Sequence, residues 1–166
     1  RSGGDPSLRR ECVRGARGAG GRDLRPRGSE LSGVVGIGLD LVEVARIRGA
    51  LTRHGERFLG RIAGPEEGRL SEARGTGHAE HVAGLFAAKE AVLKALGTGA
   101  AQGLTFRDVI ITKGPGGRPG VLLAGEARRR ADALGVTRIH LSITHERGHA
   151  AAMAVLERAA TGEGAE

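Results

Sequence analysis

The sequence predicts an α+β fold in which a small, largely antiparallel sheet packs against one long helix. Three observations predict it. An apolar run typical of a buried strand covers residues 34–42, a helical apolar pattern covers about 78–96, and two short strand patterns close the chain at about 138–144 and 149–156. The predicted order of strand, helices, hairpin, helix and two strands is typical of an α+β domain.

The first strand and the segments after it begin the domain. Within 34–42, Gly36 and Gly38 allow another backbone to approach closely. A helix is expected over about 43–54, because apolar residues recur there at helical spacing. Another helix start is expected at Pro65-Glu66-Glu67, where proline suits the first turn and acidic side chains complement the helix dipole.

The long helix over about 78–96 is expected to stop at Gly97, a favourable residue after a helix C-terminus. The last strand, about 149–156, is rich in alanine, so we expect tight packing on both of its faces, which is compatible with a subunit contact. The other expected elements are a hairpin of strands at 109–111 and 121–123, a short basic helix at 125–134 and the strand at 138–144.

The composition narrows the class of protein. The chain has 166 residues, enough for one domain, with 26 Lys and Arg against 19 Asp and Glu. It has three Phe and no Tyr or Trp, which argues against a protein that stacks single-stranded nucleic acid on aromatic rings. The only cysteine is Cys12, so we expect no intrachain disulfide, no cysteine zinc site and a cytoplasmic location. No apolar run is long enough to span a membrane.

Three segments are expected along the chain. Residues 1–33 are rich in Gly, Arg, Ser and Pro, so we expect a disordered basic extension. Because the chain begins with Arg1 rather than Met, one hypothesis is that this extension is non-native or translated from upstream sequence; a native arm that contacts nucleic acid is the alternative. Residues 34–157 are expected to form the folded domain, and 158–166 a flexible tail.

Two carboxylates are the first chemical candidates. Asp40 lies at the end of the first strand, and Glu90 lies on the long helix. Magnesium is commonly held by one or two carboxylates together with substrate phosphates, and these two residues supply that minimum. The residues alone leave an alternative open, in which Asp40 caps the following helix and Glu90 pairs with Lys94 at i, i+4.

Positive charge for phosphates is expected from the same helix. Lysine is rare in this arginine-rich chain, so Lys89 and Lys94 indicate a need for compact ammonium groups, although a solvated helix face is the alternative. Gly97-Thr98-Gly99 follows a helix C-terminus, where the dipole repels anions, which argues against a phosphate loop. His145 ends a predicted strand, from which its side chain can reach a cleft or bond to the local backbone.

Four segments together resemble one family, the holo-acyl-carrier-protein synthases, which are small bacterial 4′-phosphopantetheinyl transferases. The resemblance covers roughly residues 34–157. It implies this family's fold and its reaction, the transfer of phosphopantetheine from coenzyme A to a serine of apo acyl carrier protein with release of adenosine 3′,5′-bisphosphate. The matching segments are Gly36-Ile37-Gly38-Leu39-Asp40-Leu41-Val42-Glu43, Phe86-Ala87-Ala88-Lys89-Glu90-Ala91, Lys94-Ala95-Leu96-Gly97-Thr98-Gly99 and Ser142-Ile143-Thr144-His145.

The resemblance also implies residue roles. Asp40 and Glu90 are expected to hold Mg²⁺, and the pyrophosphate charge is expected to meet Lys94 and, less directly, Lys89. Glu90, acting through a metal-bound water, is the first choice for the base, and His145 is the second. His145 could instead contact the nucleotide, across a subunit boundary if the family's homotrimer holds. The residues expected to contact coenzyme A are Lys89, Lys94, Gly97, Thr98, Gly99 and His145.

Acyl carrier proteins are strongly acidic, so the resemblance implies a basic docking face. Arg46, Arg48 and Arg53 on the helix after Asp40 are expected to form it, with an encounter rate that falls as salt is added. Both fatty-acid and polyketide carriers are open as acceptors. The alternative function is a non-enzymatic basic module that binds nucleic acid through the N-terminal extension and the helix around 128–130.

Overall fold

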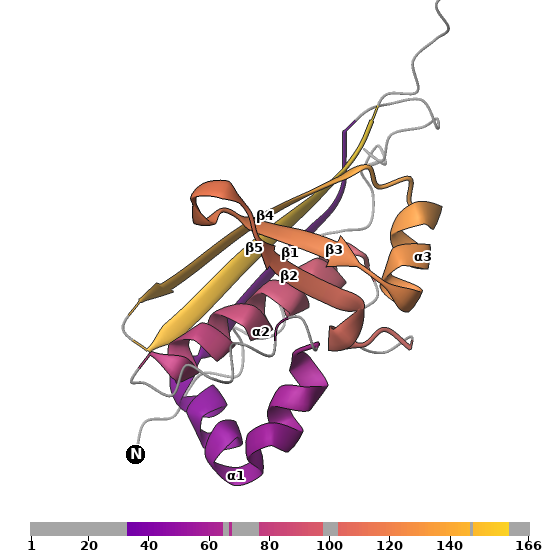
Figure 1. Ribbon diagram of the computed structural model, residues 1–166. Coiled ribbons are helices and arrows are strands. Elements are labelled where there is room, and N and C mark those ends of the chain that lie inside the picture. Colours follow the sequence, from indigo (N-terminus) through magenta and orange to yellow (C-terminus); the bar gives the residue numbers. More distant parts are fainter. Residues whose placement is uncertain (1–32, 65–66, 68–76, 98–102, 147, 160–166) are drawn as a thin grey trace, which may run out of the picture.

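A computed structural model describes residues 33–64, 67, 77–97, 103–146 and 148–159. It contains a three-stranded antiparallel sheet in the order β1-β5-β4, a separate β2-β3 hairpin, and a long helix, α2, that lies across one face of the sheet (Figure 1). The predicted α+β fold is confirmed. The elements are β1 (Gly33–Glu43), α1 (Val44–Ile62), α2 (His78–Ala95), the 3-10 turn η4 (Phe106–Asp108), β2 (Val109–Lys113), the 3-10 turn η5 (Pro115–Gly117), β3 (Pro119–Leu123), α3 (Gly125–Ala133), β4 (Arg138–Glu146) and β5 (His149–Arg158).

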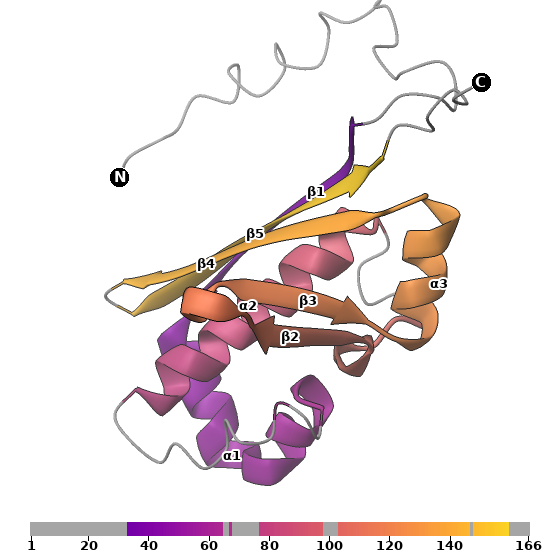
Figure 2. The same cartoon turned by 45° about the horizontal axis from the view of Figure 1, so that its top comes forward.

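Strand β5 lies at the centre of the sheet and turns one of its faces toward α2. Because side chains alternate along a strand, Ala150, Ala152, Ala154 and Leu156 all face α2 and are buried. The intervening Met153 faces the other way and is exposed. The prediction that this strand packs tightly on both faces is therefore wrong for the single chain, since only one face is covered (Figure 2).

Two glycines of β1 allow α2 to cross the sheet at close range. A Cβ atom at Gly36 would overlap the carbonyl oxygen of Ala95, and one at Gly38 would overlap the carbonyl oxygen of Ala91. Any side chain at either position would push the helix away from the strand. The close approach that the sequence predicts for this pair of glycines is confirmed, and it brings Asp40 next to the last turns of α2.

Helix α1 is longer than the sequence predicts. We expected it to end at about residue 54, but the structure continues through a break at Gly55, where φ is 43° and ψ is −126°. Glycine adopts this left-handed backbone without a Cβ penalty, so the chain bends and then buries Leu59 and Ile62. In the helix start predicted at residues 65–67, Glu67 lies in a turn, and the two residues before it fall outside the described part.

The domain boundaries lie close to those expected. Strand β1 begins at Gly33, and β5 runs through Arg158, one residue beyond each predicted limit. The disorder expected for most of the N-terminal extension and the flexible C-terminal end concern residues 1–32 and 160–166, which lie outside the described residues. Among the helices that the structure describes, none is long and apolar enough to cross a membrane.

Candidate functional site

The structure brings Asp40 and Lys94 together from positions far apart in the sequence. The Lys94 ammonium nitrogen, Nζ, lies 2.7 Å from Asp40 Oδ1 and 3.1 Å from the carbonyl oxygen of Leu39. These two hydrogen bonds join the last turn of α2 to the middle of β1. Because an ammonium group has three donors, one donor of Lys94 is left over after these two acceptors, and the side chain is about half exposed.

Glu90 lies one helical turn before Lys94 and belongs to the same group of charges. Burial raises the pKa of Glu90 above its ordinary value, and the Asp40 carboxylate raises it further. Lys94 and Arg46 oppose this increase by stabilising the charged form. We call Asp40, Glu90, Lys94 and Arg46 the carboxylate–lysine cluster.

The donor chemistry of this cluster suits a hard divalent cation. Asp40 and Glu90 supply carboxylate oxygens, and their mutual repulsion is the kind that a dication would relieve. Among the described residues no group of three or more His, Cys, Asp or Glu is positioned to hold a metal ion. A cation here would therefore draw its other ligands from water or from a bound phosphate, which is the usual arrangement for Mg²⁺.

Lys89 does not join the cluster. Its side chain is fully buried, with Nζ 2.5 Å from Glu67 Oε2 and 3.0 Å from the carbonyl oxygen of Phe106. The expected contact between Lys89 and coenzyme A has no support from this position, because the ammonium group already has acceptors inside the protein and does not reach the surface. The alternative of a solvated lysine is equally wrong.

His145 also lies away from the cluster in the single chain. It is on β4, whereas Asp40 is on β1, and β5 separates these two outer strands, so the backbones are roughly 10 Å apart. His145 instead lines a hollow of about 370 Å³ between α2, β2 and β4. The other lining residues include His81, Lys113, Leu85, Ile111 and Ile143.

The hollow combines apolar walls with basic groups. Partial burial lowers the pKa of His81, and the nearby His78, His145 and Lys113 lower it further. A positive charge on His81 is therefore disfavoured while the hollow holds no anion. A bound anion would reverse that effect, so this hollow is suited to a ligand with both phosphate and apolar parts.

The glycine segment after α2 is only partly described. Gly97 has φ of 79°, which ends the helix as expected, whereas Thr98 and Gly99 lie outside the described residues. Arg130 of α3 donates from Nε to the carbonyl oxygen of Leu96 at 3.2 Å. This guanidinium group offsets the negative end of the helix dipole, which is the feature that argued against phosphate near this segment.

The three arginines expected to dock a carrier do not share one face. Arg46 lies near Glu90, and Arg53, one heptad further along α1, lies over Gly49 on the same side of the helix. Arg48 points elsewhere and pairs with Glu80 of α2 at 3.2 Å. Of the three arginines expected to dock a carrier, Arg46 and Arg53 therefore share a face of α1 and Arg48 does not.

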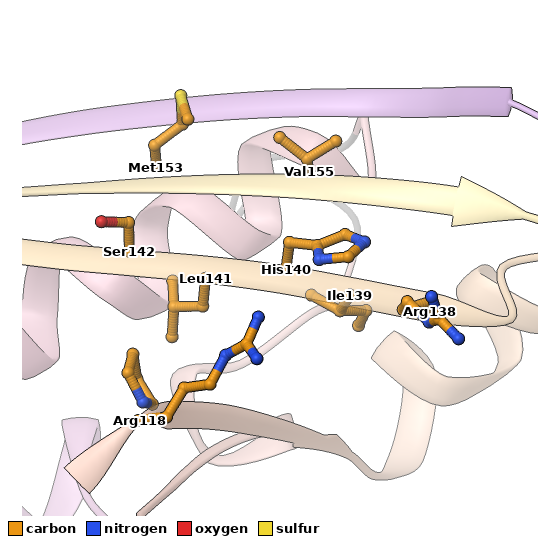
Figure 3. A pocket seen from close by; sticks show the side chains of 9 residues that line it. Arg118, Arg138, Ile139, His140, Leu141, Ser142, Met153 and Val155 are labelled. Atoms are coloured by element: carbon orange, nitrogen blue, oxygen red, sulfur yellow. The ribbon is translucent and has the colours of Figure 1, made fainter. Parts of the chain in front are cut away.

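The side of the sheet away from α2 is apolar and open. Ile37, Leu39 and Leu41 of β1 are between 62% and 66% exposed, and Met153 of β5 is 46% exposed. Beside them is a second hollow of about 380 Å³, where the Arg118 side chain extends toward β4 between Leu141 and Ile139 (Figure 3). Side chains of this size and exposure, gathered on one sheet face, are typical of an interaction surface.

Sequence reasoning missed three residues of interest. The sequence indicates Glu67 only as an acidic residue at a helix start. No local pattern indicates its contact with Lys89, because the two residues lie 22 positions apart. His81 carries no sequence signal beyond its i, i+3 spacing from His78, and its closeness to His145 depends on how β4 packs against α2. The sequence indicates Arg130 only as one of three basic residues on a helix. Its contact with Leu96, 34 residues earlier in the chain, has no signal in the sequence.

Comparisons with known proteins identify the family of this chain. The sequence pattern of the 4′-phosphopantetheinyl transferase superfamily matches residues 36–154. The holo-[acyl-carrier-protein] synthase of Maridesulfovibrio salexigens is 45% identical over 125 residues, which are 75% of this chain and 99% of that protein. The one from Solidesulfovibrio magneticus is 51% identical over 123 residues, 74% of this chain and 97% of that protein. The crystal structure of Helicobacter pylori holo-[acyl-carrier-protein] synthase in complex with coenzyme A is similar, with a TM-score of 0.64 and 34% identity, covering 72% of this chain and 98% of that chain.

Proposed function

This chain belongs to the 4′-phosphopantetheinyl transferase superfamily, and we propose that its carboxylate–lysine cluster is where phosphopantetheine moves from coenzyme A to acyl carrier protein. The protein is a holo-[acyl-carrier-protein] synthase in activity, since relatives of that name match about three quarters of the chain and nearly all of their own length. The observation that supports the site most directly is the meeting of Asp40, Glu90 and Lys94.

The reaction exchanges one phosphorus–oxygen bond for another. The serine oxygen of the carrier bonds to the phosphorus of the phosphopantetheine group, and the bond from that phosphorus to the bridging oxygen breaks. Adenosine 3′,5′-bisphosphate leaves with the electron pair of the broken bond. Negative charge grows on the phosphoryl oxygens during this exchange, and the third donor of Lys94 is available to stabilise it.

The proton of the serine needs an acceptor, and we assign Glu90 to this role. A carboxylate with a raised pKa is a stronger base than an ordinary one, and burial together with Asp40 raises the pKa of Glu90. His145, the other candidate, is on β4, which β5 separates from the strand of Asp40, and it lines the hollow beside His81.

The same two carboxylates fit Mg²⁺. Asp40 and Glu90 would hold the ion, and Lys94 already binds one oxygen of Asp40, which leaves the other oxygen for a cation. When bound, the ion would supply positive charge that neutralises the pyrophosphate of coenzyme A. Arg46 also stabilises the charged form of Glu90.

We further propose that the working unit is a homotrimer, in which the cluster of one copy meets the hollow of its neighbour. The apolar side of the sheet, with Ile37, Leu39 and Leu41 exposed, supports burial against another copy. In this arrangement His145, His81 and Lys113 would contact the nucleotide end of coenzyme A. The contact that the resemblance implies between His145 and the nucleotide then crosses a subunit boundary.

The carrier protein would approach from the side of α1. Arg46 and Arg53 share one face of that helix and are exposed, so they can pair with acidic side chains of the carrier while its serine reaches Glu90. Because these charges are exposed, the encounter should slow as salt screens them. The lone cysteine and the family's chemistry favour a cytoplasmic setting, with carriers of fatty-acid or polyketide synthesis as acceptors.

Replacing Glu90 with glutamine tests the assignment of the cluster. Glu90→Gln should abolish the transfer of phosphopantetheine to an apo carrier while the circular dichroism spectrum stays that of the folded protein. Glu56→Gln, an exposed glutamate on α1, is the matched control and should retain full activity. Full activity in Glu90→Gln would remove the cluster from the mechanism.

A further inference from the structure

Two charged side chains are buried among the residues that the structure describes. Lys89 is fully buried, and Glu67 is 4% exposed. They form an ion pair, with Lys89 Nζ 2.5 Å from Glu67 Oε2. Neither residue belongs to the carboxylate–lysine cluster, although Lys89 directly precedes Glu90 in the sequence.

The hydrogen bonds of this pair join several parts of the chain. Glu67 Oε2 also accepts from the backbone N–H of Gly64, and Oε1 accepts from the backbone N–H of Ile111, both at 2.8 Å. Lys89 also donates to the carbonyl oxygen of Phe106 at 3.0 Å. Through these hydrogen bonds the pair connects α2 to the segment after α1, to the turn before β2 and to β2 itself.

The opposite side of α2 faces β1. There the helix packs through small residues, with Gly36 and Gly38 of β1 against the backbone at Ala91 and Ala95. The directional contacts on this side are the hydrogen bonds of the half-exposed Lys94 to Asp40 and Leu39. Hydrogen bonds between buried charged groups are directional and less screened by water, so the Glu67–Lys89 pair constrains the rotation of α2 more strongly.

We propose that the Glu67–Lys89 pair fixes the rotation of α2 about its own axis, so that Glu90 and Lys94 face Asp40. Consecutive residues on a helix point about 100° apart, so fixing Lys89 against Glu67 also fixes the direction of Glu90. Lys89 is then a positioning residue that acts through Glu90 and does not touch coenzyme A. This inference rests on the proposed function, because it assumes that the cluster performs the transfer.

The test compares two single variants, Glu67→Gln and Lys89→Met, with the double variant that carries both changes. A single change leaves one buried charge without its partner and should lower the thermal midpoint, whereas the double change removes both charges and should restore much of it. If the pair positions Glu90, the double variant keeps its KM for coenzyme A within about twofold, while kcat falls by about 10- to 100-fold.

A crystal structure of the double variant gives a readout that does not depend on activity. The distance from Lys94 Nζ to Asp40 Oδ1, now 2.7 Å, is expected to lengthen beyond hydrogen-bond range. Removal of the exposed Arg128–Asp132 pair on α3 is the matched control and should change neither kcat nor that distance.

Two outcomes would overturn the proposal. Wild-type kcat in the stable double variant would make the pair purely structural, and a large rise in KM for coenzyme A in Lys89→Met alone would make Lys89 a substrate contact. Failure of the proposed function looks different, since the wild-type protein itself would then transfer nothing.

Discussion

Lys94 of α2 donates a 2.7 Å hydrogen bond to Asp40 of β1, and this contact unites two segments that the sequence keeps more than fifty residues apart. It answers the question that the residue pattern left open, whether Asp40 only caps the following helix. The N-cap position of α1 is Glu43, with no capping hydrogen bond from its side chain, and Asp40 faces α2 instead. The positive charge of Lys94 can stabilise the negative charge that develops on phosphoryl oxygens, and the negative charge of Asp40 can attract a divalent cation.

Removing the ammonium group of Lys94 should slow the transfer strongly. We expect Lys94→Met to lower kcat by about 100- to 1000-fold, because a preorganised donor to the developing phosphoryl charge is lost. The thermal midpoint should change little, since the ion pair with Asp40 is about half exposed at the lysine and such pairs contribute at most about 1 kcal/mol. Steady-state kinetics and a thermal melt check both parts, and wild-type kcat in Lys94→Met would contradict the assignment.

Glu90 should make stability depend on pH in a predictable direction. Burial and Asp40 raise the pKa of Glu90 in the folded protein, so ionisation of this group works against folding at higher pH. Without metal, Glu90→Gln should therefore melt at a higher temperature than the wild type at neutral pH. The difference should close as the pH falls below the pKa of an unfolded glutamate, where both proteins carry no charge at this position.

Melting curves in EDTA across this pH range measure the effect, with Glu56→Gln as the control that should follow the wild type. Added Mg²⁺ should raise the midpoint of the wild type but not that of Glu90→Gln, because only the wild type retains both carboxylates. A pH-independent difference between the two proteins would contradict the environment described for Glu90.

Gly38 should tolerate no side chain. A Cβ atom there would overlap the carbonyl oxygen of Ala91, so Gly38→Ala should destabilise the protein by about 1–3 kcal/mol as the strand and helix move apart. Gly60→Ala is the matched control, since Gly60 lies on a helix with open space around its Cβ direction and alanine favours helices. Chemical denaturation measures both changes, and equal effects would contradict the close packing of β1 on α2.

The hollow beside His145 should respond to the nucleotide product. Partial burial and, after it, neighbouring basic groups lower the pKa of His81, so a bound phosphate should raise this pKa. NMR titration of the histidine ring signals with and without adenosine 3′,5′-bisphosphate measures this pKa. His54, on the exposed part of α1, is an internal control whose ring signals should not change when the nucleotide is added. An unchanged pKa of His81 in the saturated complex would exclude the hollow as the phosphate site.

The sequence predicts most of the fold because its signals are local. The apolar run before Asp40, the helical spacing before Gly97 and the glycine-rich turn of the hairpin each depend on neighbouring residues only, and all three elements form as expected. The continuation of α1 was missed for a physical reason, since a glycine that normally ends a helix here bends it at Gly55. The buried residues beyond that bend stabilise a turn that propensity alone does not favour.

The site was predicted in part. The sequence singles out Asp40, Glu90 and Lys94, but only the structure shows that Lys94 meets Asp40 and that Lys89 turns inward to Glu67. A lysine beside a glutamate looks solvated in the sequence, because burial depends on a partner that lies in a separate loop. Likewise, the order of residues along the chain cannot tell that His145 lies on the far outer strand.

The transfer itself is tested by the intact mass of a purified apo acyl carrier protein after incubation with this protein, coenzyme A and Mg²⁺. The proposed role of the carboxylate–lysine cluster predicts a gain of about 340 Da, the phosphopantetheine group, which EDTA prevents because the two carboxylates act together with a divalent ion. The same gain with Asp40→Asn in place of the wild-type protein, or no gain with any fatty-acid or polyketide carrier, would contradict it.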